Sequence, residues 1–251
     1  MVKIGIIGSG NVAVHLAVAF CGSPEISFAG LYARNPEKLP ATYAGPVLGD
    51  LSELSQCDLV IIAVADDAIA SVADALPFEG RIVAHTSGSR PLEDIGTKNH
   101  GASFYPLQTF SRDRRLDYRQ IPVFLEAARD SDYGVLEAAA SLFGECRRID
   151  SKQRRAIHLS AVFACNFANH MYVLADRLCR EHDVPFSMLR PLIRETAEKV
   201  QSMEPLQAQT GPAIRGDRKT LSAHMEMLAD VRIRSLYADI TQSIQYESEK
   251  L

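Results

Sequence analysis

The chain has 251 residues, of which 47% are apolar and 23% charged, and a formal net charge of -4 at pH 7. This composition is typical of a globular protein that buries a core large enough for one large or two modest domains. The charge balance argues against nucleic acid as the main partner. No apolar run reaches the length of a membrane span.

The chain begins directly with an apolar segment, so we expect no targeting peptide and a cytoplasmic location. The cysteines show neither close pairing nor the spacing of a metal site. We therefore expect reduced, mostly buried thiols and no metal centre. These cysteines are Cys21, Cys57, Cys146, Cys165 and Cys179.

The opening segment carries the clearest functional signal. An apolar run over 2–7 predicts a buried strand, and Asn11 begins a helical period. Gly8, Gly10 and Ala13 occupy the small-residue positions of the dinucleotide fingerprint, where bare backbone can approach a pyrophosphate. The helix would direct unpaired N–H groups at that anion. We expect the cofactor to contact Gly8, Ser9, Gly10, Asn11 and Val12.

The end of the second predicted strand (26–33) indicates which dinucleotide binds. Sites that prefer NAD place a carboxylate there to bind the ribose hydroxyls. This chain has none at that position, and Arg34 stands where a 2′-phosphate would need a cation. The pattern favours NADP, although Arg34 could also be an ordinary surface residue at a helix start.

Alternating strands and helices continue to residue 150 and predict a three-layer α/β domain with a mainly parallel, Rossmann-like sheet. Asp50 or Ser52 is expected to cap a short helix, and Asp66 and Asp67 to cap the helix over 68–76. A basic stretch over 112–120 is expected to be a solvated loop. The predicted strands after the second are 58–65, 81–86, 102–105, 121–126 and 146–149, and the later helices are 92–95 and 131–143.

Beyond residue 150 the pattern is helical throughout. We expect a long helix over 152–181, others over 185–202, 219–229 and 231–247, and a loop over 206–217. The predicted organisation is a dinucleotide-binding domain, residues 1–150, followed by an all-helical substrate and dimerisation domain, residues 151–251.

Polar residues at the carboxyl ends of the strands are candidates for the reacting centre, because ligands bind at that edge of such sheets. Ala65 and Thr86 are expected to contact the cofactor. His85, Ser87 and Gln108 are candidate catalytic groups, and Thr109 a candidate substrate contact. Hydride transfer needs a donor where negative charge develops on the acceptor.

The long helix carries polar residues at steps of three or four, so they share one face. Asn166 and His170 are candidate catalytic residues there, with a structural, hydrogen-bonded role as the alternative. His170 or His85 is the favoured proton donor, because histidine titrates near neutral pH. Arg215 could bind an anionic substrate. Equally, Arg215 and Asp217 could form a network that stiffens the turn.

Four segments together resemble a family of predicted bacterial oxidoreductases. In this family a Rossmann-like NADP-binding domain precedes a helical domain of unknown function. More distantly, the layout is similar to pyrroline-5-carboxylate reductase, to deazaflavin-dependent NADP reductases and to the β-hydroxyacid dehydrogenases, among them 6-phosphogluconate dehydrogenase. The segments are 8–13 (GSGNVA), 85–88 (HTSG), 106–110 (PLQTF) and 210–217 (TGPAIRGD).

The resemblance implies NADP(H), a homodimer built through the helical domain, and a small polar substrate in a cleft between the domains. At two positions the sequence departs from the pattern of these relatives. Tyr105 stands where relatives often have histidine, and Val162 stands one turn before Asn166, where β-hydroxyacid dehydrogenases have lysine. An aliphatic side chain cannot transfer a proton. The expected function is an NADP-dependent oxidoreductase, and the alternative is an NADP(H)-binding sensor without turnover.

Overall fold

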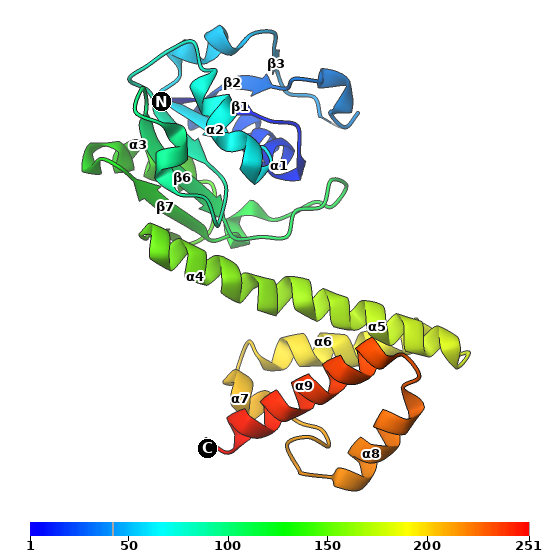
Figure 1. The fold of residues 1–251 in the computed structure, drawn as a ribbon. Helices are drawn as coiled ribbons and strands as arrows, with labels where there is room; N and C mark the ends of the chain where they lie inside the picture. Colours follow the sequence, from blue (N-terminus) through cyan, green and yellow to red (C-terminus); the bar gives the residue numbers. More distant parts are fainter. Residues whose placement is uncertain (42, 251) are drawn as a thin grey trace. The chain divides into compact units, whose positions relative to one another are not determined.

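The computed structural model describes residues 1–41 and 43–250 and divides into two compact units, Met1–Asn166 and Phe167–Leu251. The first contains the sheet and the start of the long helix, and the second is helical (Figure 1). The strands end before Asp150, as the sequence pattern indicates. The boundary between the two compact units falls later in the chain, at Asn166, because the first turns of the long helix belong to the unit that contains the sheet. The predicted functional boundary at residue 150 stays a prediction.

The sheet has eight strands in the order β3-β2-β1-β4-β5-β6-β7-β8. All neighbouring pairs are parallel except β6 and β7, which are antiparallel and joined by a loop without a crossover helix. The fold class is the expected Rossmann-like α/β unit followed by helices. The strands are β1 (Val2–Ile7), β2 (Ile26–Tyr32), β3 (Val47–Leu48), β4 (Leu59–Ile62), β5 (Ile82–His85), β6 (His100–Pro106), β7 (Val123–Ala127) and β8 (Cys146–Arg148).

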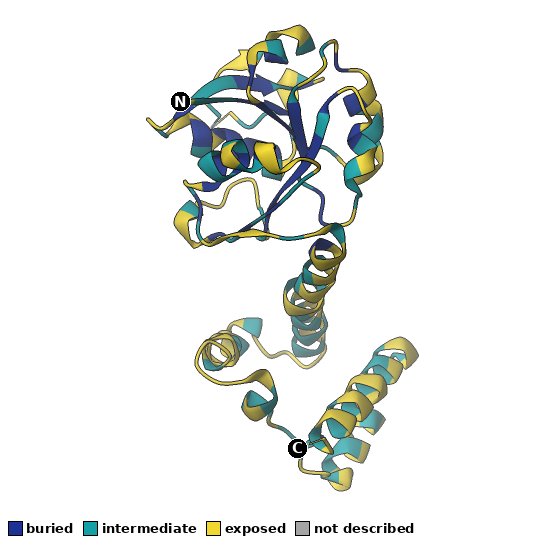
Figure 2. Cartoon of the chain, turned by 90° about the vertical axis from the view of Figure 1, so that its left-hand side faces the viewer, coloured by how far each residue is buried: buried dark blue, intermediate teal, exposed yellow. Residues whose placement is uncertain are grey.

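Both faces of the central strands are buried, which explains their uninterrupted apolar sequences. Ile4 and Ile6 of β1 enter the cluster that packs under α1 (Asn11–Cys21) and α3 (Tyr133–Ala140). Ile7 enters the cluster on the other face, under α2 (Ile69–Asp74) and the short turns η2 (Leu51–Gln56) and η4 (Leu92–Ile95). Figure 2 shows the buried residues concentrated in this unit.

Two local predictions need correction. Asp66 and Asp67 do not cap a helix: the N-cap positions of η3 (Asp66–Ala68) and α2 are Ala65 and Ala68, and neither makes a side-chain cap. The edge strand β3 was not predicted, because its two residues are too few to produce a periodic pattern. By contrast, Asp50 does cap η2 through a capping box with Glu53. The remaining short turns are η1 (Pro36–Lys38), η5 (Tyr118–Gln120) and η6 (Asp130–Asp132).

The long helical run is continuous from Ser151 to Glu181 but changes its winding. A π-helical stretch, η7 (Val162–Phe167), separates α4 (Ser151–Ala161) from α5 (Ala168–Glu181). The expected loop over 206–217 also begins within a helical turn. The other helical elements are η8 (Phe186–Leu189), α6 (Arg190–Lys199), α7 (Pro205–Ala208), α8 (Arg218–Met227) and α9 (Val231–Ser248).

The second unit has almost no core of its own. Among the described residues from 167 to 250, only Ala213 and Leu228 are buried. Large apolar side chains such as Met188 and Leu192 are 70% and 63% exposed. None of the helices in the described part of the chain combines the length and apolarity needed to span a bilayer.

Candidate dinucleotide site

A cavity of about 750 Å³ opens at the carboxyl ends of β1 and β4. These strands flank the point where strand order reverses, which is where ligands bind in doubly wound sheets. The volume suits a cofactor-sized ligand. All eight residues predicted to contact the cofactor line it, namely Gly8, Ser9, Gly10, Asn11, Val12, Arg34, Ala65 and Thr86.

The glycine loop gives the cavity a floor of bare backbone. Gly8 has a φ of 142° and lies so close to the Ala63 carbonyl that a Cβ would collide with it. Gly10 has an ordinary φ of -76°, and a Cβ there would meet nothing within 4 Å. Gly10 is also the N-cap of α1 and offers no capping side chain. The first N–H groups of α1 are therefore left for an anion.

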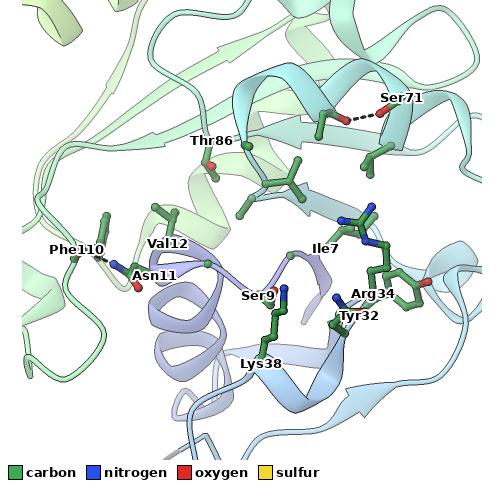
Figure 3. Close-up of a pocket in the computed structure, with 18 of the residues that line it drawn as sticks. Ile7, Ser9, Asn11, Val12, Tyr32, Arg34, Lys38, Ser71, Thr86 and Phe110 are labelled. Atoms are coloured by element: carbon green, nitrogen blue, oxygen red, sulfur yellow. Dashed lines mark hydrogen bonds between the residues drawn. The ribbon is translucent and has the colours of Figure 1, made fainter.

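One end of the cavity is basic. Arg34, just after β2, and Lys38 of η1 both line it and are exposed to solvent. Figure 3 shows the two side chains entering the same space, on the side of Ser9 away from Thr86. Lys38 was not singled out in the sequence, because a lysine in a polar turn carries no signal of its own. A pair of cations suits a phosphomonoester better than one arginine does.

The other end is formed by Thr86, Gln108 and Phe110. The loop that carries Phe110 is docked on α1, because Asn11 Nδ2 donates to the Phe110 carbonyl at 2.9 Å (Figure 3). His15 bonds the same loop through the Ser111 carbonyl at 2.9 Å. Gln108 Oε1 accepts from the Thr109 N–H at 2.8 Å, and the Gln108 amide nitrogen has no partner among the described residues. Thr109 itself is exposed and lies outside the cavity lining.

The loop after β5 is held in place by side-chain hydrogen bonds. Ser87 and Ser89 both donate to Asp66 Oδ2, at 2.8 and 2.7 Å. The Ser87 hydroxyl also accepts from the backbone N–H groups of Ser89 and Arg90. Asp66 thus braces this loop instead of capping a helix. The Ser87 hydroxyl, a candidate catalytic donor, is fully occupied within the protein.

A buried arginine holds this loop from the other side. The Arg154 side chain on α4 is completely inaccessible, and its Nη1 donates to the carbonyls of Ser87 and Arg90 at 2.9 and 2.7 Å. Its Nε and Nη2 bond Glu126 on β7. The sequence pattern did not single out Arg154, since a lone arginine on a helix is ordinarily a surface residue.

His85 is sealed inside the sheet and has an exposed fraction of 0%. Burial, with the nearby Arg154 charge adding to it, lowers the pKa of His85 to about 4. The ring is therefore neutral at physiological pH, and its Nδ1 accepts from the Ser87 N–H at 3.2 Å. This environment gives His85 a structural role and does not support the prediction that it donates a proton.

Two residues that the sequence did not identify as a pair meet at the sheet edge. The Tyr105 hydroxyl at the end of β6 lies 2.9 Å from His158 Nδ1 on α4. The His158 ring packs directly over Gly88, where a Cβ would come within 2.5 Å of its Cγ. His158 lies on the long helix whose polar residues the sequence pattern groups on one face, and Tyr105 is one of the two departures from the related sequences. Side-chain geometry was needed to bring them together.

The remaining candidates lie on the long helix and in the second unit. Asn166 is exposed within the π-helical stretch, a kind of irregularity often found at functional sites. His170 on α5 is also exposed. Asp217 caps α8, and hydrogen bonds from Thr220, with the nearby Arg215 charge adding to them, hold the pKa of Asp217 below its usual value. The network with Arg215 stays the alternative. Substrate roles for Asn166, His170 and Arg215 stay predictions.

Comparisons with known proteins agree with this architecture. The family model for a domain of unknown function, DUF2520, matches residues 121–244. A "putative NADP oxidoreductase" of Bacteroides fragilis is 38% identical over 98% of both chains, with a TM-score of 0.85. The chain therefore belongs to the NADP oxidoreductase-like Rossmann family that the sequence resembles. No curated protein matches the chain.

More distant structures share the fold. An imine reductase of Streptomyces aurantiacus is 15% identical, covers 96% of this chain and 93% of its own, and has a TM-score of 0.69. A pyrroline carboxylate reductase of Plasmodium falciparum, solved with NADP bound, is 14% identical, covers 99% and 97%, and has a TM-score of 0.61. At this identity the likeness concerns the fold alone.

Proposed function

We propose that the protein is an oxidoreductase that transfers a hydride between NADP(H) and a small polar substrate. The observation that carries this proposal is the cavity itself. It combines a side-chain-free helix N-terminus, a glycine positioned for close backbone approach and a basic end. The names of related proteins, an NADP oxidoreductase and two reductases, support the same class of reaction.

The lining also suggests the direction in which the cofactor binds. The pyrophosphate would lie over Gly8 and Gly10 at the start of α1. The 2′-phosphate would bind Arg34 and Lys38 at the basic end. The nicotinamide would then lie toward Thr86 and Gln108. When bound, this cofactor supplies the hydride, and the protein has to orient the acceptor and supply a proton.

The proposed substrate is small and polar, and its identity is left to experiment. Gln108 could orient it through the free amide nitrogen. Asn166, His170 and Arg215 are proposed as substrate contacts on chemical grounds, since amide, imidazole and guanidinium groups bind polar or anionic ligands. Each is exposed and available to a ligand.

We also propose that the helical unit forms a homodimer. A unit of this size that buries only Ala213 and Leu228 among its described residues lacks the core that a stable domain needs. Exposed apolar residues such as Met188, Leu192 and Val231 would find that core in a second copy. Sedimentation should give twice the chain mass, and Leu192→Glu should shift it toward the monomer. A wild-type monomer at all concentrations would contradict the dimer.

The coenzyme preference tests the function directly. Fluorescence titration should show that Arg34→Ala weakens NADPH binding at least tenfold and NADH binding by less than threefold, because only NADPH carries the 2′-phosphate. Arg112→Ala, at an exposed arginine outside the cavity lining, is the matched control. Equal weakening of both coenzymes by Arg34→Ala would mean that this residue does not bind the phosphate.

A sensor that binds NADP(H) without turnover is the alternative. Val162 favours it, because that position on the long helix has no group that can transfer a proton. Steady-state assays of NADPH oxidation with imino acids, keto acids and oxidised deazaflavin distinguish the two functions. Tight binding without oxidation across this panel would favour the sensor.

A further inference from the structure

The hydrogen-bonded pair of Tyr105 and His158 lies on segments that continue into the end of the cavity proposed for the nicotinamide. Thr86, which lines the cavity, is two residues before Gly88, and Gly88 supports the His158 ring. Gln108, also in the lining, is three residues after Tyr105. Tyr105 is therefore joined to the cavity by the three residues that lead to Gln108, and His158 by its packing on Gly88.

The two rings are held in a defined geometry. Their centroids are 5.9 Å apart with an interplanar angle of 73°, and the hydroxyl lies 2.9 Å from Nδ1. Tyr105 is 9% exposed, and His158 is half-buried. A tyrosine hydroxyl backed by an imidazole is the arrangement of a general acid with its proton reservoir.

A second tyrosine–histidine pair in the same unit shows what a purely structural pair looks like. The Tyr118 hydroxyl lies 3.2 Å from His15 Nδ1, and His15 Nε2 is bonded to the Ser111 carbonyl. Both nitrogens of that ring are used within the protein. In the described part of the chain, His158 makes a hydrogen bond only through Nδ1, which leaves Nε2 able to exchange protons with water.

We propose that Tyr105 donates the proton to the substrate during reduction and that His158 returns a proton to it. This inference rests on the proposed function and goes beyond it by naming a proton donor. It replaces His85, which is sealed in the sheet, and does not depend on a lysine at position 162. The substrate class it fits is a molecule with a reducible C=N or C=O bond, here represented by a cyclic imine.

The proton and electron balance is simple. The hydride adds to the imine carbon, the C=N π bond breaks, and its electron pair takes the Tyr105 proton to form the amine N–H. The phenolate oxygen then takes the Nδ1 proton of the His158 imidazole while Nε2 of the same ring takes one proton from solvent. Tautomer exchange with solvent returns the proton to Nδ1. The net reaction consumes one hydride and one proton, as the reduction requires.

The surroundings keep the hydroxyl protonated before the reaction. Burial raises the pKa of Tyr105, and the carboxylate of Asp66 acts in the same direction. The buried guanidinium of Arg154 opposes them and would stabilise the transient phenolate. These are the charged groups that act on Tyr105 from η3 and α4, the elements beside it.

The first test needs no substrate. In protein carrying ¹³C-labelled histidine and tyrosine, titration with NADP⁺ should give nuclear Overhauser effects from the nicotinamide H4 proton to the Tyr105 ring or to His158 Hε1. Assignment uses the signals lost in Tyr105→Phe and His158→Asn. Contacts from H4 to other labelled rings with none to this pair would overturn the inference. Absence of any NADP⁺ binding would instead contradict the proposed function, and this inference with it.

The second test separates proton donation from packing. With NADPH and 1-pyrroline as probes, Tyr105→Phe should lower kcat at least 100-fold and change KM less than threefold. His158→Asn keeps a polar atom near the Nδ1 position but cannot supply a proton, so it should lower kcat at least tenfold. Wild-type kcat in His158→Asn would show that His158 only orients the hydroxyl.

The matched control is Tyr237→Phe. Tyr237 on α9 bonds His224 Nδ1 at 2.8 Å, so the substitution removes the same kind of hydrogen bond in the helical unit. It should leave kcat within twofold of wild type. A similar loss of kcat in Tyr105→Phe and Tyr237→Phe would contradict a specific role for Tyr105.

Discussion

Arg154 on α4 and Glu126 on β7 form an ion pair whose arginine side chain has no exposed surface. The Arg154 Nη2 lies 2.9 Å from Glu126 Oε2, and its other donors hold the carbonyls of Ser87 and Arg90. One side chain thus joins the long helix, the strand β7 and the loop after β5. His158 follows Arg154 by one helical turn, and its ring packs over Gly88 in the same loop that Arg154 bonds.

Removing this arginine should be severely destabilising. Arg154→Met leaves the Glu126 carboxylate and two carbonyls without their partner, so we expect a loss of about 3–5 kcal/mol in the free energy of unfolding. Urea denaturation measures it. The neighbouring Arg155→Met, at an exposed position, is the control and should change stability by less than about 0.5 kcal/mol. A similar small effect at Arg154 would show that the pair contributes little.

Gly10→Ala should separate binding from folding. The backbone at Gly10 has a φ of -76° and an added Cβ meets no atom within 4 Å, so the fold has room for the methyl group. That methyl would occupy the space proposed for the pyrophosphate, and NADPH binding should fall at least tenfold. Gly10→Val should abolish it.

Gly134→Ala in α3 is the control for Gly10→Ala, because that glycine is also unobstructed but lies outside the cavity lining. It should leave NADPH binding unchanged and should not lower the melting temperature. Unchanged NADPH affinity in Gly10→Ala would mean that no ligand approaches this backbone.

Lys38→Ala tests the second cation of the basic end. Because Lys38 shares the lining with Arg34, its removal should weaken NADPH binding about threefold to tenfold and leave NADH binding nearly unchanged. Calorimetric titration at two salt concentrations measures both, and the loss should shrink at high salt. Lys219→Ala, on α8, should have no effect. Equal losses for the two coenzymes would remove Lys38 from the phosphate site.

His85 should make stability depend on pH. Its pKa is about 4 in the folded protein against an ordinary 6.5, so between these values the unfolded chain binds the proton more tightly. The contribution of His85 to the free energy of unfolding is complete above pH 6.5. It is lost as the pH falls toward 4, by at most about 3 kcal/mol.

The matched variant for this prediction is His85→Asn, which keeps an acceptor for the Ser87 N–H. Denaturant unfolding at pH 7 and at pH 4.5 should show a smaller acid-induced loss in this variant than in wild type. Equal losses in both proteins would mean that His85 does not titrate abnormally.

The sequence predicted which residues line this cavity because the signals are local. Gly8, Gly10 and Asn11 lie in one strand–turn–helix unit, and Arg34 follows the adjacent strand. Backbone geometry and strand order then place these residues together without help from distant contacts. Lys38 was missed because its approach to the cavity depends on the turn at η1.

The proton-transfer candidates were harder to predict because they depend on side-chain contacts across distant segments. His85 fits the pattern of a catalytic residue at a strand end, yet its side chain is buried in the sheet. Tyr105 and His158 are 53 residues apart and meet only when α4 packs against the sheet edge. The sequence around Asp66 predicts a helix cap. Its hydrogen-bond partners are instead Ser87 and Ser89, which lie in the loop after β5 and are not near Asp66 in the sequence.

The most direct test of the central claim is a fluorescence titration of the purified, folded chain with NADPH and with NADH. A helix N-terminus for the pyrophosphate and two cations for the 2′-phosphate predict saturable binding of NADPH at least ten times tighter than that of NADH. Failure of both coenzymes to bind at millimolar concentration would contradict the account.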